Sequence, residues 1–506
     1  MSPGANRHTC VPASVVWRAT TGKQYQPATR SPPSTQPQVL AINTAVPSTV
    51  VFPRLALLGH VTSGFANLGV SMWFVLYGLA AVLGLTILAV RVQVVPAGTA
   101  AAVRPEGSED HAWSPSATRT ASVGAAIGQV IGVALFVAVL VAALAGDPAG
   151  GSNPAPLVVF VAFFMGMGVV SMVVGDVWSV VNPFSTIAGL IERVRRSGPP
   201  DESERPKAVH VAGSDAAQNR DWWLPAALLF SFEAWWLVVV DGTRPRGVAV
   251  WLLGYSAVML VGGVFGGRRW CRRNDPFAVL FAAFAELAPV EFDGGRPRWR
   301  TPLRRLSVIP CAPRRAAVLA VLVGSIAFDH AASTNWWLSK VNQQSEVTFT
   351  AVNLVGLAWC VGLTAIAWTA ACRLAVGPDR DKGADELSID LCPALVPLIA
   401  GLFLGYALPR LLIDTQNVVA LSSDPFGRGW DLFGTLSLGL NEQPISAGVA
   451  GWLRVGFFAA GAMASIAVLH RRVLLHAPQP ARPAAAPLLG FVVFATLGGT
   501  RLVLGT

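Results

Sequence analysis

Charged residues are scarce in this chain of 506 residues, at 13% of the total, whereas hydrophobic residues make up 53%. A water-soluble chain of this length would carry about 25% charged residues and would divide into two or three domains. The composition therefore excludes an ordinary soluble protein and favours a single bundle embedded in a membrane.

Motifs for nucleotide binding and for several common hydrolytic sites are also absent. The chain has no Walker A sequence, no G-x-S-x-G, no H-E-x-x-H and no Rossmann fingerprint. Its seven histidines are scattered singly, and its six cysteines include no C-x-x-C pair. Five of the cysteines fall in predicted helices or cytoplasmic loops, where thiols stay reduced. Neither a disulfide framework nor a zinc ribbon is expected.

Long apolar runs dominate what is present. A hydrocarbon core about 30 Å thick needs about 20 apolar residues in a helix. Ten runs of roughly that length occur, at residues 70–90, 123–145, 157–177, 222–240, 248–266, 316–333, 349–372, 393–412, 449–469 and 486–504. The sequence therefore predicts an all-α fold, a polytopic transmembrane bundle of about ten helices within residues 61–506.

Basic residues alternate between the connecting loops. Loops 91–122, 181–221, 267–315, 373–392 and 470–485 hold 26 Lys and Arg, whereas loops 146–156, 241–247, 329–348 and 413–448 hold 4. This pattern predicts that the Arg-rich loops face the cytoplasm of a bacterial inner membrane. The net charge of +10 is explained by the same loops, which lie beside membrane segments, so lipid rather than nucleic acid is the expected partner.

The first sixty residues differ in composition from the rest. Residues 1–60 are polar, rich in Pro, Ser and Thr, and without periodicity, which predicts a disordered N-terminal extension. The alternation of loops places this end outside.

A sequence motif occurs twice, about 92 residues apart, within repeat-like units at about 123–196 and 222–290. The first copy reads G-D-V-W-S-V-V-N-P-F from Gly175, and the second reads G-R-R-W-C-R-R-N-D-P-F from Gly267. The shared motif residues are Trp178, Asn182 and Pro183 in one copy and Trp270, Asn274 and Pro276 in the other.

The spacing of the motif is typical of a helix start. Asn182 or Asp275 can accept hydrogen bonds from unpaired helix amides, and the following proline suits the first helical position. Each copy then predicts a membrane hairpin followed by an amphipathic helix at the inner interface, with the two copies in parallel orientation. The alternative is an anion site between the two helix starts.

Several ionisable residues fall inside or near the predicted helices. Glu233 lies eleven residues into the fourth apolar run, without a counter-charge among its neighbours. It is either a proton-carrying or substrate-contacting carboxyl, or a neutral group bonded to a neighbouring helix. Asp329 and His330 form either an acid–base or metal-ligand pair, or a structural pair whose members face different ways.

Three arginines lie near predicted outer helix ends, where the topology rule does not explain them. These are Arg410, Arg454 and Arg501, and Asp414 follows Arg410 at the spacing of a helical ion pair. The arginines either pair with Glu233, Asp329 and Asp414 or bind an anionic group such as phosphate.

The external loop 413–448 contains the sequence S-S-D-P-F-G-R-G-W-D-L-F-G from Ser422. Its glycines predict tight turns, and Trp430 with its aromatic neighbours predicts a lid folded back over the bundle. Asp424 and Asp431 either bind a cation or cap turns.

These motifs, in this order, resemble the bacterial fenitrothion hydrolase family of polytopic membrane proteins over most of the chain from His60 onward. The resemblance rests on the two W-x-x-x-N motifs, on Phe328-Asp329, on L-V-P at 395–397 and, most specifically, on S-D-P-x-G-x-G-W-D-L-F-G-T at 423–435. This chain has Tyr406 and Ala462 where the family tends to carry His, and Arg471 where an Asp is usual.

The resemblance implies a membrane-bound hydrolase of organophosphorus triesters, with a metal or a base to activate water and cations facing the phosphoryl oxygens. For an enzyme, the candidate catalytic residues are those singled out above, Asp329, His330, Asp414 and Glu233, and the candidate substrate-binding residues are Arg410, Arg454, Trp430, Asp424 and Asp431. A divalent metal ion is the candidate cofactor, and a lipophilic small molecule is the candidate substrate. The alternatives are a transporter or permease, favoured by Glu233, and a non-catalytic subunit that assembles with a partner membrane protein.

Overall fold

The computed structural model describes nine stretches of the chain, all within one compact unit that spans Phe52–Thr506. The described residues are 70–92, 119–148, 151–196, 223–293, 296–341, 344–376, 384–441, 443–476 and 485–504. The predicted disordered extension, residues 1–60, lies outside them.

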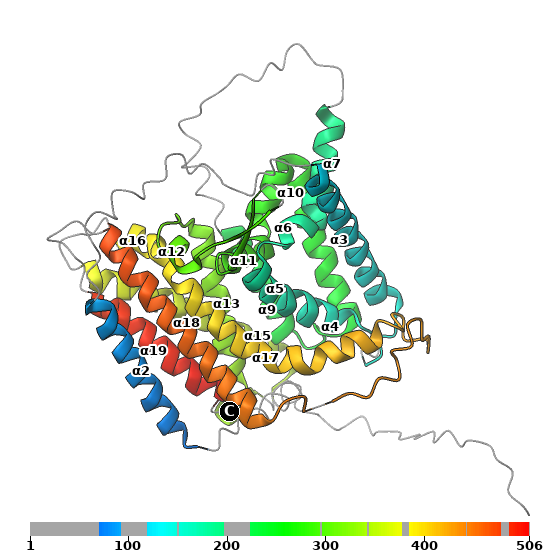
Figure 1. Ribbon diagram of the computed structural model, residues 1–506. Coiled ribbons are helices and arrows are strands. Elements are labelled where there is room, and N and C mark those ends of the chain that lie inside the picture. The colour runs from blue at the N-terminus through cyan, green and yellow to red at the C-terminus, as the bar shows by residue number, and fades with distance from the viewer. Residues whose placement is uncertain are drawn as a thin grey trace, which may run out of the picture. The chain divides into compact units, whose positions relative to one another are not determined.

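The described part is almost entirely helical, and eight of its helical segments are long and apolar enough to cross a membrane. They are α2 (Met72–Val92), α3 (Arg119–Ala145), the run of α4 (Ala155–Leu157), η3 (Val158–Gly166) and α5 (Met167–Val174), α10 (Pro245–Asn274), α13 (Pro313–Ala332), α15 (Glu346–Val376), η5 (Cys392–Leu395) with α17 (Val396–Leu421), and α18 (Ala447–His476). Figure 1 shows α2 beside α18 and α19 (Ala485–Leu504), and α3 beside α10.

Two of the ten predicted spans are not among these eight helical segments. Helix α9 (Trp223–Leu237) has 15 residues, so it rises about 22 Å, less than a hydrocarbon core of about 30 Å. Helix α19 has 20 residues, as the run at 486–504 predicts, and only its part Ala486–Arg501 counts as an apolar helix among the described side chains. The structure therefore supports eight crossing helices by length and composition.

Helices α17 and α18 pack against each other at small residues. A Cβ added to Gly401 would lie 2.4 Å from the Phe457 carbonyl oxygen, and one added to Gly461 would lie 2.5 Å from that of Pro397. Small residues allow such close backbone approach between membrane helices. Across this contact Arg454 of α18 donates from its Nε to the Gly405 carbonyl oxygen of α17.

The repeated motif adopts the same backbone conformation in both copies. Gly175 (φ 115°, ψ −167°) ends α5, and Gly267 (φ 68°, ψ −168°) breaks α10, each in a region that L side chains rarely adopt. Helix α6 (Trp178–Val181) follows the first glycine, before α7 (Pro183–Arg196). The predicted caps are confirmed: Asn182 accepts from the Ser185 amide and Asp275 from the Phe277 amide.

The two copies are joined at Asp275, whose carboxylate is fully buried. Its Oδ2 accepts from the Trp178 indole at 2.8 Å and from the Asn182 amide at 2.6 Å, both in the first copy. Its Oδ1 accepts from the Tyr255 hydroxyl at 2.8 Å and from the Phe277 amide. The space between the caps, which the sequence left open as an anion site, is therefore occupied by the chain's own carboxylate.

The two helices that follow the motifs differ in their surroundings. Helix α7 packs against α10, and the Glu192 carboxylate accepts from the Arg268 amide at the break. Helix α11 (Pro276–Ala285) buries eight of its ten residues, so it is a core helix rather than the interfacial amphipathic helix that the sequence predicts. The reason is composition, because no charged residue interrupts P-F-A-V-L-F-A-A-F-A. Trp178 is also buried, through its bond to Asp275, and does not lie at a surface.

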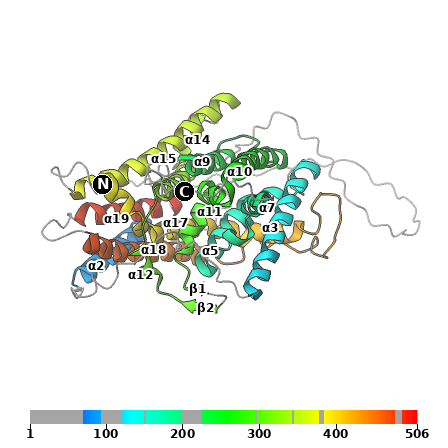
Figure 2. The same cartoon turned by 90° about the horizontal axis from the view of Figure 1, so that it is seen from above.

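The remaining described elements are short. The hairpin of β1 (Val290–Asp293) and β2 (Arg296–Trp299) lies at the edge of the bundle in Figure 2. Helices α12 (Pro302–Leu306), α14 (Asn335–Val341) and α16 (Ala384–Asp390) lie between the long helices in sequence. Arg472 of α18 is buried and donates to the backbone carbonyls of Leu306, Ile309 and Asp390. Arg472 therefore links α18 to the C-terminal ends of α12 and α16.

Candidate functional site

Six polar side chains converge inside the bundle and are called here the buried polar cluster. The cluster consists of Glu233 of α9, Asp329 and His330 of α13, Tyr406 and Arg410 of α17, and Arg454 of α18. His330 interacts electrostatically with Asp329, Arg410 and Arg454. Tyr406 interacts with Glu233 and Asp329. Four helices distant in sequence thus contribute to one site.

The two arginines carry hydrogen-bond donors that have no acceptor. Arg454 is only 1% exposed, and its Nε donates to the Gly405 carbonyl oxygen at 3.0 Å, but its Nη1 is buried without a partner in the described residues. Arg410 is 7% exposed and its buried Nε also lacks a partner there. Its guanidinium lies over the Trp236 ring, 5.3 Å from the centroid. A buried donor without an acceptor is unfavourable, so these two donors are available to an additional acceptor.

The hydrogen bond made by His330 fixes which ring nitrogen carries the proton in the neutral form. Its Nδ1 lies 2.8 Å from the Ile326 carbonyl oxygen, which can only accept. Nδ1 is therefore the donor, and Nε2 keeps a lone pair in neutral imidazole. The ring packs edge-on against Tyr406 with centroids 5.7 Å apart. The histidine is thus buried, oriented and able to act as a base.

Two carboxyls complete the cluster. Glu233 is 3% exposed, interacts electrostatically with Asp329, and has an Oε1 without a hydrogen-bond partner among the described residues. The Tyr406 hydroxyl interacts with Asp329. Phe232 and Trp236, on the same helix as Glu233, pack against Phe160.

The structure brings together five of the residues predicted from the sequence, namely Glu233, Asp329, His330, Arg410 and Arg454. The predicted internal ion pairs are not formed, because neither Arg410 nor Arg454 makes a direct salt bridge within the described part of the chain. Asp414 interacts electrostatically with Arg410 without such contact. The sequence reading missed Tyr406 as a member of the site and noted it only as a departure from the family.

The predicted lid residues serve the fold of their own loop. Asp424 accepts from the amides of Arg428 and Gly429, at 2.9 Å and 2.6 Å. Asp431 accepts from the Ser423 hydroxyl at 2.8 Å and from the Leu436 amide at 3.1 Å. Of the two roles left open by the sequence, turn capping is therefore the one observed.

These contacts alter the acidity of both loop carboxyls. Burial opposes the charged form of Asp424, but backbone amides, led by that of Arg428, outweigh it and lower the pKa. The Leu436 amide and the Ser423 hydroxyl lower the pKa of Asp431 below its usual value. Trp430 packs against Phe426, whose carbonyl oxygen accepts from the Asp147 amide at 3.1 Å. The loop is thus anchored on the turn between α3 and α4.

The remaining residues of the repeated motif make contacts within the fold. Trp270 packs back onto its own helix, because a Cβ added to Gly262 would lie 2.0 Å from its ring. Asn274 donates to the Trp270 carbonyl oxygen at 3.1 Å. Pro183 and Pro276 begin α7 and α11.

A metal site requires at least three converging ligands. The described residues contain no group of three or more His, Cys, Asp and Glu side chains that could hold a metal ion. The buried polar cluster, as described, does not fit a preformed divalent metal site.

The buried polar cluster therefore offers donors for an oxyanion, one oriented imidazole and two carboxyls, in apolar surroundings. Comparisons of this chain with protein-family models, with curated proteins and with solved structures found no match.

Proposed function

We propose that this protein is a multi-pass enzyme of the bacterial inner membrane that hydrolyses a lipophilic phosphoric or thiophosphoric triester at the buried polar cluster. The observation that carries the proposal is the pair of buried guanidiniums with unpaired donors, Arg410 Nε and Arg454 Nη1, beside an oriented His330. The resemblance to the fenitrothion hydrolase family supports the same reaction class.

A neutral triester suits a site enclosed by apolar helices. Such a substrate carries no net charge, so it can leave lipid and reach the cluster without a large desolvation penalty. Negative charge appears on the phosphoryl oxygen or sulfur only as the nucleophile attacks. Donors already placed around that atom then stabilise the transition state more than the substrate.

In the proposed reaction, His330 Nε2 takes a proton from a water molecule as the water oxygen bonds to phosphorus. The phosphorus–phenolate bond breaks, and the phenolate leaves with the electron pair and is later protonated by solvent. Arg410 and Arg454 donate to the atom that gains charge. Asp329 lies next to His330 and stabilises the imidazolium that forms, while Tyr406 holds Asp329 in place.

The proposed topology has ten crossings, with the Arg-rich loops in the cytoplasm. Contacts between loops support it. Arg472 joins three loops of the set predicted to lie inside, and the Asp147–Phe426 bond joins two loops of the set predicted to lie outside. In this topology Asp329 and Arg454 lie near the outer ends of their helices, so a substrate would enter from the periplasmic half of the bilayer.

Release of nitrophenolate from a nitrophenyl dialkyl phosphotriester by the purified full-length protein tests the proposal, with and without added divalent metal ions. We expect release by the wild-type protein, and a loss of 10²-fold or more in His330→Gln and Arg454→Met, as order-of-magnitude estimates for a base and an oxyanion donor. Arg471→Met is the matched control, because Arg471 is exposed on the same helix. Turnover that is absent in the wild type, or equal in all variants, contradicts an enzymatic role.

A second function, proton-coupled transport, is favoured by Glu233 alone. A buried carboxyl with an unpaired oxygen inside a membrane bundle is typical of a proton carrier. Uptake of a solute into proteoliposomes under a pH gradient, abolished in Glu233→Gln, together with the absence of triester hydrolysis, would establish transport instead.

A further inference from the structure

A second site lies between α13, α15, α17 and α19, where the structure has an apolar pocket of about 530 Å³. Its walls are almost entirely hydrocarbon, from residues such as Ala316, Ala320, Trp368 and Leu402. The volume lies in the range of about 300–1,000 Å³ that holds small organic ligands in proteins. None of the buried polar cluster lines it, so it is separate from the proposed reaction site.

A cation, Arg315, lies near one end of this pocket without lining it. The lining begins at Pro313, the first residue of α13, and includes Cys392. Arg315 lies between Pro313 and Ala316 in sequence and interacts electrostatically with Cys392. Its Nη1 is buried, and no hydrogen-bond partner for it exists in the described part of the chain. The same end of α13 has an alanine at its N-cap, which offers no side-chain acceptor to the first amides.

The neighbouring buried cation behaves differently. Arg472 also interacts electrostatically with Cys392, but its guanidinium donates to the carbonyls of Leu306, Ile309 and Asp390. Arg315 therefore has the unused donor at this end. A buried guanidinium donor with no acceptor calls for an anion.

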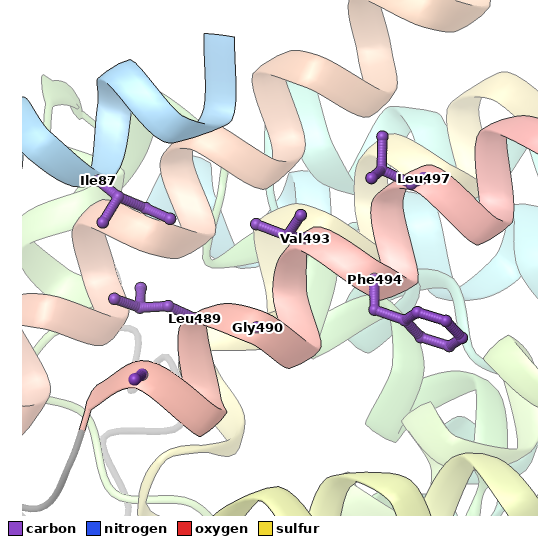
Figure 3. A pocket seen from close by; sticks show the side chains of 7 residues that line it. Ile87, Leu489, Gly490, Val493, Phe494 and Leu497 are labelled. Carbon is purple, nitrogen blue, oxygen red and sulfur yellow. The ribbon is translucent and has the colours of Figure 1, made fainter. Parts of the chain in front are cut away.

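A second apolar groove gives a natural comparison. Figure 3 shows it along α19, where Ile87 of α2 faces Leu489, Val493 and Leu497. Its volume is about 440 Å³, and no charged side chain lines it. The groove has hydrocarbon walls but offers nothing to an ionic headgroup, so it is suited to ordinary lipid contact only.

We propose that the pocket between α13, α15, α17 and α19 holds one acyl chain of an anionic phospholipid, whose phosphate accepts hydrogen bonds from Arg315 at the start of α13. The acyl chain fills the apolar volume, and the headgroup stays near the polar surface where α13 begins. The Arg-rich loops predicted to face the cytoplasm place this end in the inner leaflet. The inference rests on that membrane topology and is independent of triester hydrolysis.

Native mass spectrometry of the detergent-purified full chain, supplied with phosphatidylglycerol or phosphatidylcholine, tests the retention of lipid. We expect one retained phospholipid with at least tenfold preference for the anionic lipid. Ala320→Phe should reduce retention at least tenfold by filling the pocket. Gly490→Phe in the comparison groove is the matched control, because a Cβ there meets no atom within 4 Å. Arg315→Gln should remove the preference for phosphatidylglycerol.

A measurement on the wild-type protein keeps the proposal testable if a variant fails to fold. A phosphatidylglycerol with a photoactivatable acyl chain should label pocket residues such as Trp368 and Thr364, and unlabelled phosphatidylglycerol should compete. Labelling confined to other helices, equal loss of lipid in Ala320→Phe and Gly490→Phe, or an unchanged preference in Arg315→Gln would overturn the proposal. Loss of hydrolysis in any of these variants has no bearing on it.

Discussion

Asp275→Asn is expected to separate the two copies of the repeated motif. The substitution keeps the size of the side chain but replaces one acceptor oxygen by an NH₂ donor. The native carboxylate accepts from four groups, namely the Trp178 indole, the Asn182 amide, the Tyr255 hydroxyl and the Phe277 amide. An asparagine cannot satisfy all of them in either orientation.

The expected loss in the free energy of unfolding follows from the number of donors that lose their acceptor. With its oxygen toward Trp178 and Asn182, the new side chain can donate to the Tyr255 oxygen after the hydroxyl rotates, but the Phe277 N–H faces another donor. One buried amide then loses its acceptor, which costs about 1–3 kcal/mol. The bonds to Trp178 and Asn182 lose their charge assistance, about 1 kcal/mol each, since bonds to charged groups are roughly twice as strong. The total loss of stability is about 3–5 kcal/mol.

Denaturant titration of the purified protein in mixed micelles, followed by tryptophan fluorescence, measures the free energy of unfolding. The matched control is Asp176→Asn in the first copy, whose carboxylate caps the Ser179 amide at 3.1 Å. Asparagine is as good an N-cap as aspartate, so this change should cost only a few tenths of a kcal/mol. Equal effects of the two substitutions would refute the conclusion that Asp275 joins the copies.

Three further predictions are tested by the same unfolding assay or by limited proteolysis. Gly267→Ala should lower the free energy of unfolding by at least about 1–2 kcal/mol, because φ is +68° and the new Cβ would lie 1.7 Å from Glu192 Oε1. Gly490→Ala, which has open space around its Cβ, should leave that free energy unchanged. Arg472→Gln should destabilise by about 3–5 kcal/mol through loss of its bonds to three backbone carbonyls, and the exposed neighbour Arg471→Gln should leave stability within about 0.5 kcal/mol. The loop at 422–436 should become sensitive to proteases as pH falls below 3.8, because the folded pKa of Asp431 lies below that ordinary value and the stabilisation present above it is lost on protonation. In the double variant Asp424→Asn and Asp431→Asn, which removes both loop carboxyls with a lowered pKa, the loop should be equally sensitive to proteases above and below that pH, and an acid-dependent step retained there would show that another group is responsible.

The helices were predictable because their signals are local. Apolar length located eight crossing helices, and the Asn-Pro and Asp-Pro pairs located the starts of α7 and α11. The burial of α11 was not predictable in this way, since a ten-residue apolar stretch suits either an interface or a core. Only its neighbours in space decide, and α5, α9 and α13 all pack against it.

The candidate site was predictable as a set of residues but not as an arrangement. Charges in apolar runs single out Glu233, Asp329, Arg410 and Arg454, because each is unfavourable in lipid and has to face protein. Tyr406 gave no such signal, since tyrosine is ordinary in a membrane helix. Its role arises from its position one helical turn before Arg410, which brings its hydroxyl to Asp329 and its ring to His330.

Two buried carboxyls in this chain show why the presence of hydrogen-bond partners, rather than burial, separates structural from functional groups. Asp275 and Glu233 are both removed from solvent, at 0% and 3% exposure. The four donors around Asp275 are all protein groups, so nothing remains for a ligand to do. One oxygen of Glu233 and one donor on each of Arg410 and Arg454 have no partner in the described residues, although opposite charges lie on neighbouring helices. Such groups are costly to bury without partners, so stability alone does not account for the cluster. Their unmet hydrogen bonds are available to a polar ligand, which is the physical basis for placing the proposed chemistry at this cluster and not at the repeated motif.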